Sequence, residues 1–203
     1  LGYFTDPILS TMLDYPDVRL AELIIHELTH GTVFANGFTD FNESLAAFVG
    51  ESGSIMFLRS QHVAEQEIAE VLARREEDRS FRAFMTTVVA DLDSLYSLGL
   101  PTEQVLEDRQ RVFRASQAHF REQHEGLATG RYAHLLRWEV NNAALLSYRR
   151  YNRDMELFED LRTLKDGSLL KTVALCRTCA AAAPNPWNCL RDSLQAPSRS
   201  SIE

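Results

Sequence analysis

Residues 17–36 read DVRLAELIIHELTHGTVFAN, and this stretch decides the fold that the sequence predicts. It is rich in helix-forming residues, and the proline before it, Pro16, suits the opening turn of a helix. Asn36 and Gly37 supply a left-handed stop at the other end. We therefore expect one helix from Asp17 to Asn36.

The pattern His-Glu-x-x-His lies inside this helix, as His26-Glu27-Leu28-Thr29-His30. Residues four apart lie on one face of a helix, so both imidazoles can reach one metal ion. Zinc takes neutral nitrogen ligands and in catalytic sites keeps one position for water, which Glu27 can deprotonate. The surrounding residues are apolar, and unpartnered polar groups buried there would cost on the order of several kcal/mol. We therefore favour a zinc site over two histidines that are hydrogen-bonded within a core.

A second helix is expected over residues 41–58, after the short loop 37–40. Two helices joined by so short a loop lie side by side. We expect Gly50 and Gly53 to loosen this helix in its middle.

The third ligand decides the class of zinc site. In a metzincin a third histidine follows shortly after the second, but the sixth residue after His30 is Asn36, which excludes that class. Glu43 is the candidate from the next helix, and Asp40 is its rival. As alternatives, Asp40 would cap the helix, and Glu43 would complete a helix-opening box with it.

Residues 41–48, FNESLAAF, resemble the Asn-Glu-x-x-Ala segment by which gluzincins such as thermolysin and the aminopeptidase N family present a glutamate to zinc. Twelve residues separate His30 from Glu43, fewer than in those two families. Ala47 stands where thermolysin-like sites carry an aspartate that orients a histidine.

A third resemblance covers more of the chain. Residues 2–11, the motif helix, the FNES segment and the later polar positions are together similar to the bacterial putative aminopeptidase family of exported gluzincin-like proteins. The similarity spans roughly residues 2–161 and is densest over 6–49. It implies zinc as cofactor, with His26, His30 and Glu43 as ligands and Glu27 as general base. Members are longer at the N terminus, so we expect this chain to be N-terminally truncated.

The same resemblance places Asn141, Asn142 and Tyr151 in a second polar cluster. We expect the two asparagines to bind substrate, and we infer that Tyr151 donates a hydrogen bond to the developing oxyanion. Helix capping is the alternative for the asparagines, and half-buried packing is the alternative for Tyr151.

The remaining periodicity predicts further helices. One covers residues 61–99 with a kink near 76–80, another starts after Pro101 and folds back on it, and two more cover 141–151 and 155–164. A short extended piece near 3–8 is the one candidate strand.

The expected fold is mainly α, with a zincin-like catalytic helix pair followed by a bundle of long antiparallel helices. We expect one gluzincin-like metallopeptidase domain over residues 1–194, the C-terminal part of a longer protein, and a disordered tail over 195–203.

Charge and hydropathy exclude some classes of partner. The net charge of -8 repels phosphate backbones, so nucleic acid is not expected, and no run reaches the roughly 18 apolar residues of a membrane-spanning helix. Because members of that family are exported, the resemblance implies that this protein is located in the periplasm or cell envelope.

The other metal-binding residue types are not assigned to a site. Cys176, Cys179 and Cys189 are an odd number, which cannot form a closed disulfide framework, and they lack the fourth ligand of a zinc site. The remaining histidines stand singly on polar stretches and are interpreted as surface residues: His62, His119, His124 and His134.

The sequence thus predicts a zinc-dependent metallopeptidase that acts on peptide substrates, with aminopeptidase activity implied by the resemblance. Two alternatives come from other classes. One is a catalytically inactive zinc-binding helical module that binds a cell-envelope partner, and the other is an all-helical scaffold with an accidental motif.

Overall fold

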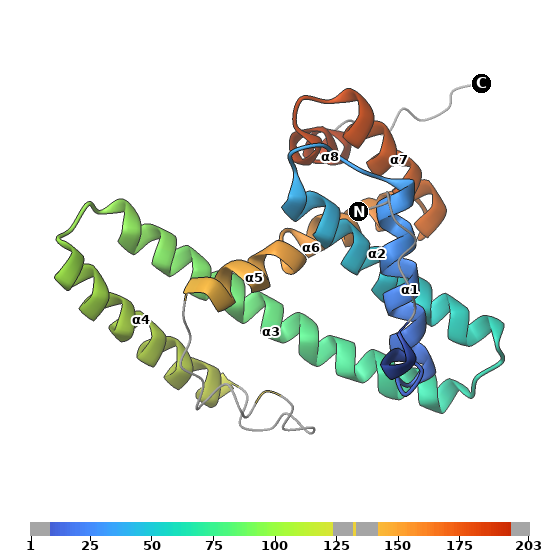
Figure 1. The fold of residues 1–203 in the computed structure, drawn as a ribbon, viewed down its shortest axis with the longest axis horizontal. Coiled ribbons are helices and arrows are strands. Elements are labelled where there is room, and N and C mark those ends of the chain that lie inside the picture. The colour runs from blue at the N-terminus through green and yellow to red at the C-terminus, as the bar shows by residue number, and fades with distance from the viewer. Residues whose placement is uncertain (1–8, 124–131, 133–141, 196–203) are drawn as a thin grey trace. The chain divides into compact units, whose positions relative to one another are not determined.

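The computed structural model describes residues 9–123, 132 and 142–195. Over these ranges every regular element is a helix (Figure 1), which confirms the mainly α prediction. The extended piece expected near residues 3–8 lies outside them, as does the expected tail except for Gln195, which ends a helix. The chain forms two compact units, one from Leu1–Val63 with Arg149–Glu203 and the other from Ala64–Tyr148. The single domain expected over residues 1–194 stays a prediction.

The first unit begins with a short 3-10 helix, η1 (Ser10–Met12), and two helices that pack side by side, α1 (Asp17–Thr32) and α2 (Thr39–Ser60). The side-by-side packing confirms the expectation from the short loop. The predicted end of α1 at Asn36 is wrong by one turn, because the chain becomes extended at Val33 and buries Val33 and Ala35 in the core.

Glycine allows α1 and α2 to approach closely. The predicted loosening of α2 is wrong, since the helix runs unbroken through Gly50 and Gly53. A Cβ atom on Gly50 would lie 2.8 Å from the backbone oxygen of Glu22, and one on Gly53 would lie 3.0 Å from Cδ1 of Ile25. Gly50 therefore needs a residue without a side chain, whereas at Gly53 the side chain of Ile25 would have to shift by a few tenths of an ångström.

Three further helices complete the first unit: α6 (Met155–Leu164), α7 (Leu169–Ala182) and α8 (Pro186–Gln195). The sequence predicted α6 and missed α7 and α8. They bury a shared core against α2, in which the rings of Phe48 and Phe158 stack with centroids 5.4 Å apart. The boundary between the units falls within α5 (Asn142–Asn152), of which residues 149–152 belong to the first unit.

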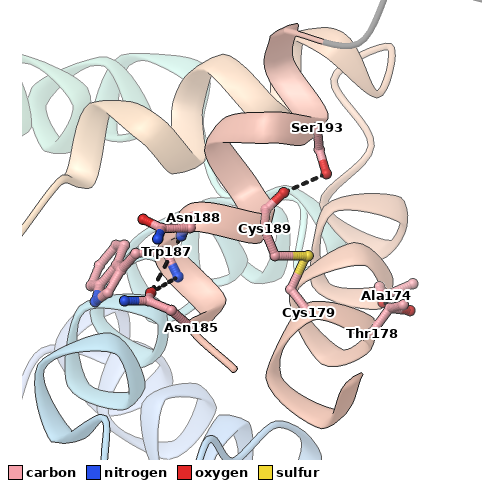
Figure 2. Close-up of a disulfide and its surroundings, with 8 residues drawn as sticks. All are labelled: Ala174, Thr178, Cys179, Asn185, Trp187, Asn188, Cys189 and Ser193. Carbon is pink, nitrogen blue, oxygen red and sulfur yellow. Dashed lines mark hydrogen bonds between the residues drawn. A yellow bond between two sulfur atoms is a disulfide. The ribbon is translucent and has the colours of Figure 1, made fainter. Parts of the chain in front are cut away.

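A disulfide joins α7 to α8. Figure 2 shows the bond between Cys179 and Cys189, beside the start of α8, where Asn185 Oδ1 accepts from the backbone N–H of Trp187 at 2.9 Å. Two of the three cysteines pair and one is left over, which agrees with the expectation that an odd number forms no closed framework. Cys176 stays a free, buried thiol, and burial raises its pKa to about 12.

The second unit is built on two long helices, α3 (Glu65–Ser97) and α4 (Thr102–Gln123). α4 folds back along α3, as predicted. α3 is one helix through residues 76–80, where a kink was expected. Apolar side chains of α3, α4 and the start of α5 form a separate core: Phe81, Met85, Val88, Leu92, Leu95, Phe113, Phe120 and Leu145. In the part of the chain that the structure describes, no helix is long and apolar enough to cross a membrane.

We expect Gly50→Ala to lower the free energy of unfolding by roughly 1–3 kcal/mol, the scale of an overpacked contact, because the new methyl group would meet a backbone oxygen that cannot turn away. Urea-induced unfolding measures the change. Gly31→Ala is the matched control in α1, where nothing lies within 4 Å of the added Cβ. The control should gain about 0.5–1 kcal/mol from the better helix former. Equal stabilities of the two variants would contradict the role given to Gly50.

Candidate functional site

Three side chains from α1 and α2 meet where the two helices pack. Nε2 of His26 lies 3.3 Å from Nε2 of His30. Oε2 of Glu43 lies 3.4 Å from the first of these atoms and 3.6 Å from the second. The histidines share one face of α1 because they are four residues apart, and the short loop brings Glu43 to that face. The structure thus brings together the three residues that the sequence predicted as a ligand set.

The spacing of these atoms fits a tetrahedral metal site. Ligand atoms roughly 2.0–2.1 Å from a zinc ion stand roughly 3.3–3.4 Å from one another at the corners of a tetrahedron. The three measured distances of 3.3, 3.4 and 3.6 Å are close to this edge length. Within the described ranges, no other group of three or more His, Cys, Asp or Glu residues could hold a metal ion. His26, His30 and Glu43 could therefore hold one ion and leave a fourth position open.

Burial favours the form of His30 that binds a metal. Its side chain is 3% exposed. Burial lowers the pKa of His30, and the charge of Glu43 opposes this shift. The neutral imidazole keeps a lone pair for a metal ion. Its second nitrogen, Nδ1, is buried with no hydrogen-bond partner, so no described side chain orients this ring through that atom.

Glu27 lies next to this group on α1. Its charge is near enough to His30 to oppose, like that of Glu43, the lowering of that residue's pKa by burial. The carboxylate is partly exposed and makes no hydrogen bond or ion pair with the residues that the structure describes. It is therefore free to take up a proton from a molecule bound at the site.

Tyr151 reaches the site from the end of α5. Its ring centroid lies 6.3 Å from that of His26, and the residue is 40% exposed. The structure therefore places the ring of Tyr151 beside a candidate ligand, in a partly exposed position. Asn141 lies outside the described residues, and Asn142 is described only as the first residue of α5. Substrate binding by the two asparagines stays a prediction.

The chain matches one protein family, described as "Putative aminopeptidase", over residues 1–185. The chain belongs to this family. The match confirms the family that the sequence resembles, and the name of the family suggests a peptidase. Comparison with curated proteins and with solved structures gives no match.

Asp40 of this aminopeptidase-family chain is neither the N-cap residue of α2 nor one of the three side chains that meet at the candidate metal site. The N-cap of α2 is Phe38, so Asp40 lies in the first turn, where its Oδ1 accepts from the N–H of Phe41 at 2.9 Å. Its other oxygen accepts from the guanidinium of Arg153. The helix-opening box with Glu43 is therefore not formed, and the charge of Asp40 is paired with Arg153.

Asn42 and Ser44 flank Glu43 and were not singled out in the sequence. The buried amide of Asn42 accepts from the N–H of Ala35 at 2.8 Å and donates to the carbonyl of Ala35 at 3.0 Å. This pair of bonds holds the segment after α1 against α2. The buried hydroxyl of Ser44 bonds the backbone of Arg150 and Arg153. The partners are backbone atoms, which carry no signal in the sequence.

The second unit holds a hollow between α3 and α4. Small and apolar side chains line most of it, and Asp91 and His119 are among its polar members. No group of three metal-ligating side chains meets there within the described ranges. The first unit therefore carries the candidate chemistry of this aminopeptidase-family protein.

We expect Glu43→Gln to weaken the binding of a divalent ion by roughly tenfold to a hundredfold, because a neutral amide replaces an anionic ligand. Competition between the protein and a chelator, with Zn²⁺ as the probe, measures the affinity. Asp40→Asn is the matched control, an acid-to-amide change one turn earlier on α2, and should leave the affinity within about twofold. Equal affinities for Glu43→Gln and the unchanged protein would remove Glu43 from the ligand set.

Proposed function

We propose that this protein is a zinc-dependent metallopeptidase of the gluzincin type, and that it acts as an aminopeptidase on peptide substrates. The proposal is based on one observation: the side-chain nitrogens of His26 and His30 and a carboxylate oxygen of Glu43 lie 3.3 to 3.6 Å from one another. Glu27 lies next to them on α1. Membership of the aminopeptidase family supports the same reaction class. The α1–α2 pair is then the zincin-like catalytic pair.

The donor set favours zinc. Two imidazole nitrogens and one carboxylate oxygen, with a fourth position open, are the ligands of a catalytic zinc site. When bound, the ion supplies a Lewis acid and lowers the pKa of a coordinated water molecule. His26 and His30 would hold the ion as neutral imidazoles, and Glu43 would supply one negative charge.

Glu27 is proposed as the general base and acid. It would take a proton from the attacking water and deliver a proton to the amine that leaves when the peptide bond breaks. Its partial exposure and the absence of a bond to any described residue suit this role. Since it lies beside the ligands and not among them, it contributes little to holding the ion.

Tyr151 is proposed to stabilise the transition state. The carbonyl oxygen of the substrate becomes negative as water adds to the carbon, and a phenol hydroxyl near the ion can donate a hydrogen bond to it. The support is the position of the ring, 6.3 Å from that of His26, together with its exposure to solvent.

We also propose that the protein works in the periplasm or cell envelope. The Cys179–Cys189 disulfide supports this, because such bonds persist in oxidising compartments and are rare in the reducing cytosol.

We expect the protein purified without chelators, and its Glu27→Gln variant, to carry about one zinc ion per chain, while the variant loses roughly a hundredfold or more in peptidase rate. Elemental analysis and turnover of a peptide library measure the two quantities. Asp17→Asn, a change at an exposed acid at the start of α1, is the control and should keep both the zinc content and the peptidase rate. A variant as active as the unchanged protein would disprove the mechanism. Bound zinc without turnover in the unchanged protein would favour the inactive module.

Cells are lysed under denaturing conditions in the presence of a maleimide-linked polymer, which adds a fixed mass to each free thiol that gel electrophoresis can detect. We expect one labelled thiol per chain, that of Cys176. Reduction before labelling should give three. Cys179→Ser should show two without reduction, because Cys189 loses its partner. Three free thiols in the unchanged protein without reduction would contradict an oxidising location.

A further inference from the structure

One buried hydroxyl links α2 to the backbone on both sides of Tyr151. Ser44 Oγ donates to the carbonyl of Arg150 at 3.2 Å and accepts from the N–H of Arg153 at 3.0 Å. The residue is fully buried. Because a hydroxyl serves once as donor and once as acceptor here, a side chain without it cannot make either bond.

Arg153 is also held through its side chain. Asp40, one turn before Ser44 on the same face of α2, accepts from the guanidinium of Arg153. The guanidinium carbon lies 5.4 Å from the ring centroid of Trp187, which is 2% exposed. A cation over an aromatic face is attracted to it, so Arg153 is fixed from two directions.

Tyr151 has weaker constraints of its own. It is 40% exposed, and its hydroxyl has no hydrogen bond within the described ranges. Its place beside His26 is therefore set by the backbone that carries it. That backbone is fastened to α2 at Arg150 and Arg153, one residue before Tyr151 and two residues after it.

We propose that Ser44 is a positioning residue for Tyr151, which fixes the corner between α5 and α6 so that the phenol stays over the metal-binding face. This inference rests on the proposed function, in which Tyr151 donates to the substrate carbonyl oxygen. The Ser44 hydroxyl makes no hydrogen bond to the three candidate ligands and acts on the reaction through Tyr151. Since Glu43 and Ser44 are neighbours on α2, one helix supplies both a ligand and the anchor of the oxyanion donor.

The first test is the kinetics of Ser44→Ala. A misplacement of about 1 Å in a group that acts on the transition state can cost on the order of a hundredfold in rate. We expect kcat to fall by roughly tenfold to a hundredfold, with KM and zinc affinity within about twofold, because the donor acts in the transition state and not in binding. Ser52→Ala is the matched control. Ser52 is also buried on α2, and its hydroxyl accepts from Arg162 of α6 at 3.2 Å, away from the corner. It should keep full kcat.

The second test is a double-mutant cycle. Tyr151→Phe should lower kcat by roughly a hundredfold to a thousandfold, the cost of one oxyanion donor. In the Tyr151→Phe background, Ser44→Ala should then lower kcat further by less than about twofold, because the hydroxyl that Ser44 positions is absent. Equal losses in both backgrounds, or full kcat in Ser44→Ala, would overturn the proposal.

Hydrogen exchange tests the anchor without relying on activity. The N–H of Arg153 should exchange at least tenfold faster in Ser44→Ala, while α1 keeps its protection. Unchanged exchange at Arg153 would overturn the proposal even in an active enzyme. If the N–H of Arg153 exchanges faster in Ser44→Ala but the unchanged protein shows no peptidase activity, the proposed function is contradicted. The role of Ser44 in holding the backbone at Arg153 is then still supported.

Asp40→Asn covers the case in which Ser44→Ala does not fold, as judged by thermal unfolding. It keeps the backbone bonds of Ser44 and weakens only the pair with the Arg153 guanidinium. We expect a loss of roughly threefold to tenfold in kcat with unchanged zinc affinity, and no loss in the Tyr151→Phe background. A loss that persists in that background would overturn the proposal.

Discussion

The close approach of α1 and α2 is the constraint on which the rest of the site depends. Gly50 lies two turns after Glu43 on the same face of α2, and a Cβ there would already lie 3.4 Å from Cβ of His26. If the two helices moved apart at Gly50, the carboxylate would leave the histidines. His30 and Glu43 are both buried, and desolvating them costs free energy that the apolar core beside them offsets.

Successive residues of α2 point in different directions and have different tasks. Phe41 packs into the core, Asn42 holds the segment after α1, Glu43 faces the histidines and Ser44 fastens the corner that carries Tyr151. Each residue is rotated by about 100° from the one before it. An insertion of one residue within 41–44 would therefore redirect the side chains after it, so the spacing of this segment matters as much as the identity of its residues.

The parts of the structure that the sequence revealed are those that depend on local spacing. Two histidines four apart and a glutamate on the next helix meet because helical geometry and a short loop leave little choice. The two tasks of Asp40 and Ser44 could not be predicted, since their partner Arg153 follows more than a hundred residues later. α7 was missed because Ala, Thr and Cys dominate its end and blur any apolar stripe. α8 has only 10 residues, fewer than the window over which a helical period can be recognised. The pairing of Cys179 with Cys189 follows from the turn between those helices.

The chain order of the first unit has a consequence for how the site assembles. His26, His30 and Glu43 are close in sequence, whereas the bonds of Ser44 to Arg150 and Arg153 span 106 and 109 residues. Contacts between distant residues require closing a long loop, whose entropic cost grows with its length, and proteins rich in such contacts fold slowly. During synthesis the three residues could therefore come together within a nascent helix pair, long before the ribosome has released the corner that carries Tyr151. The ability to capture an ion would then precede the ability to turn over a substrate.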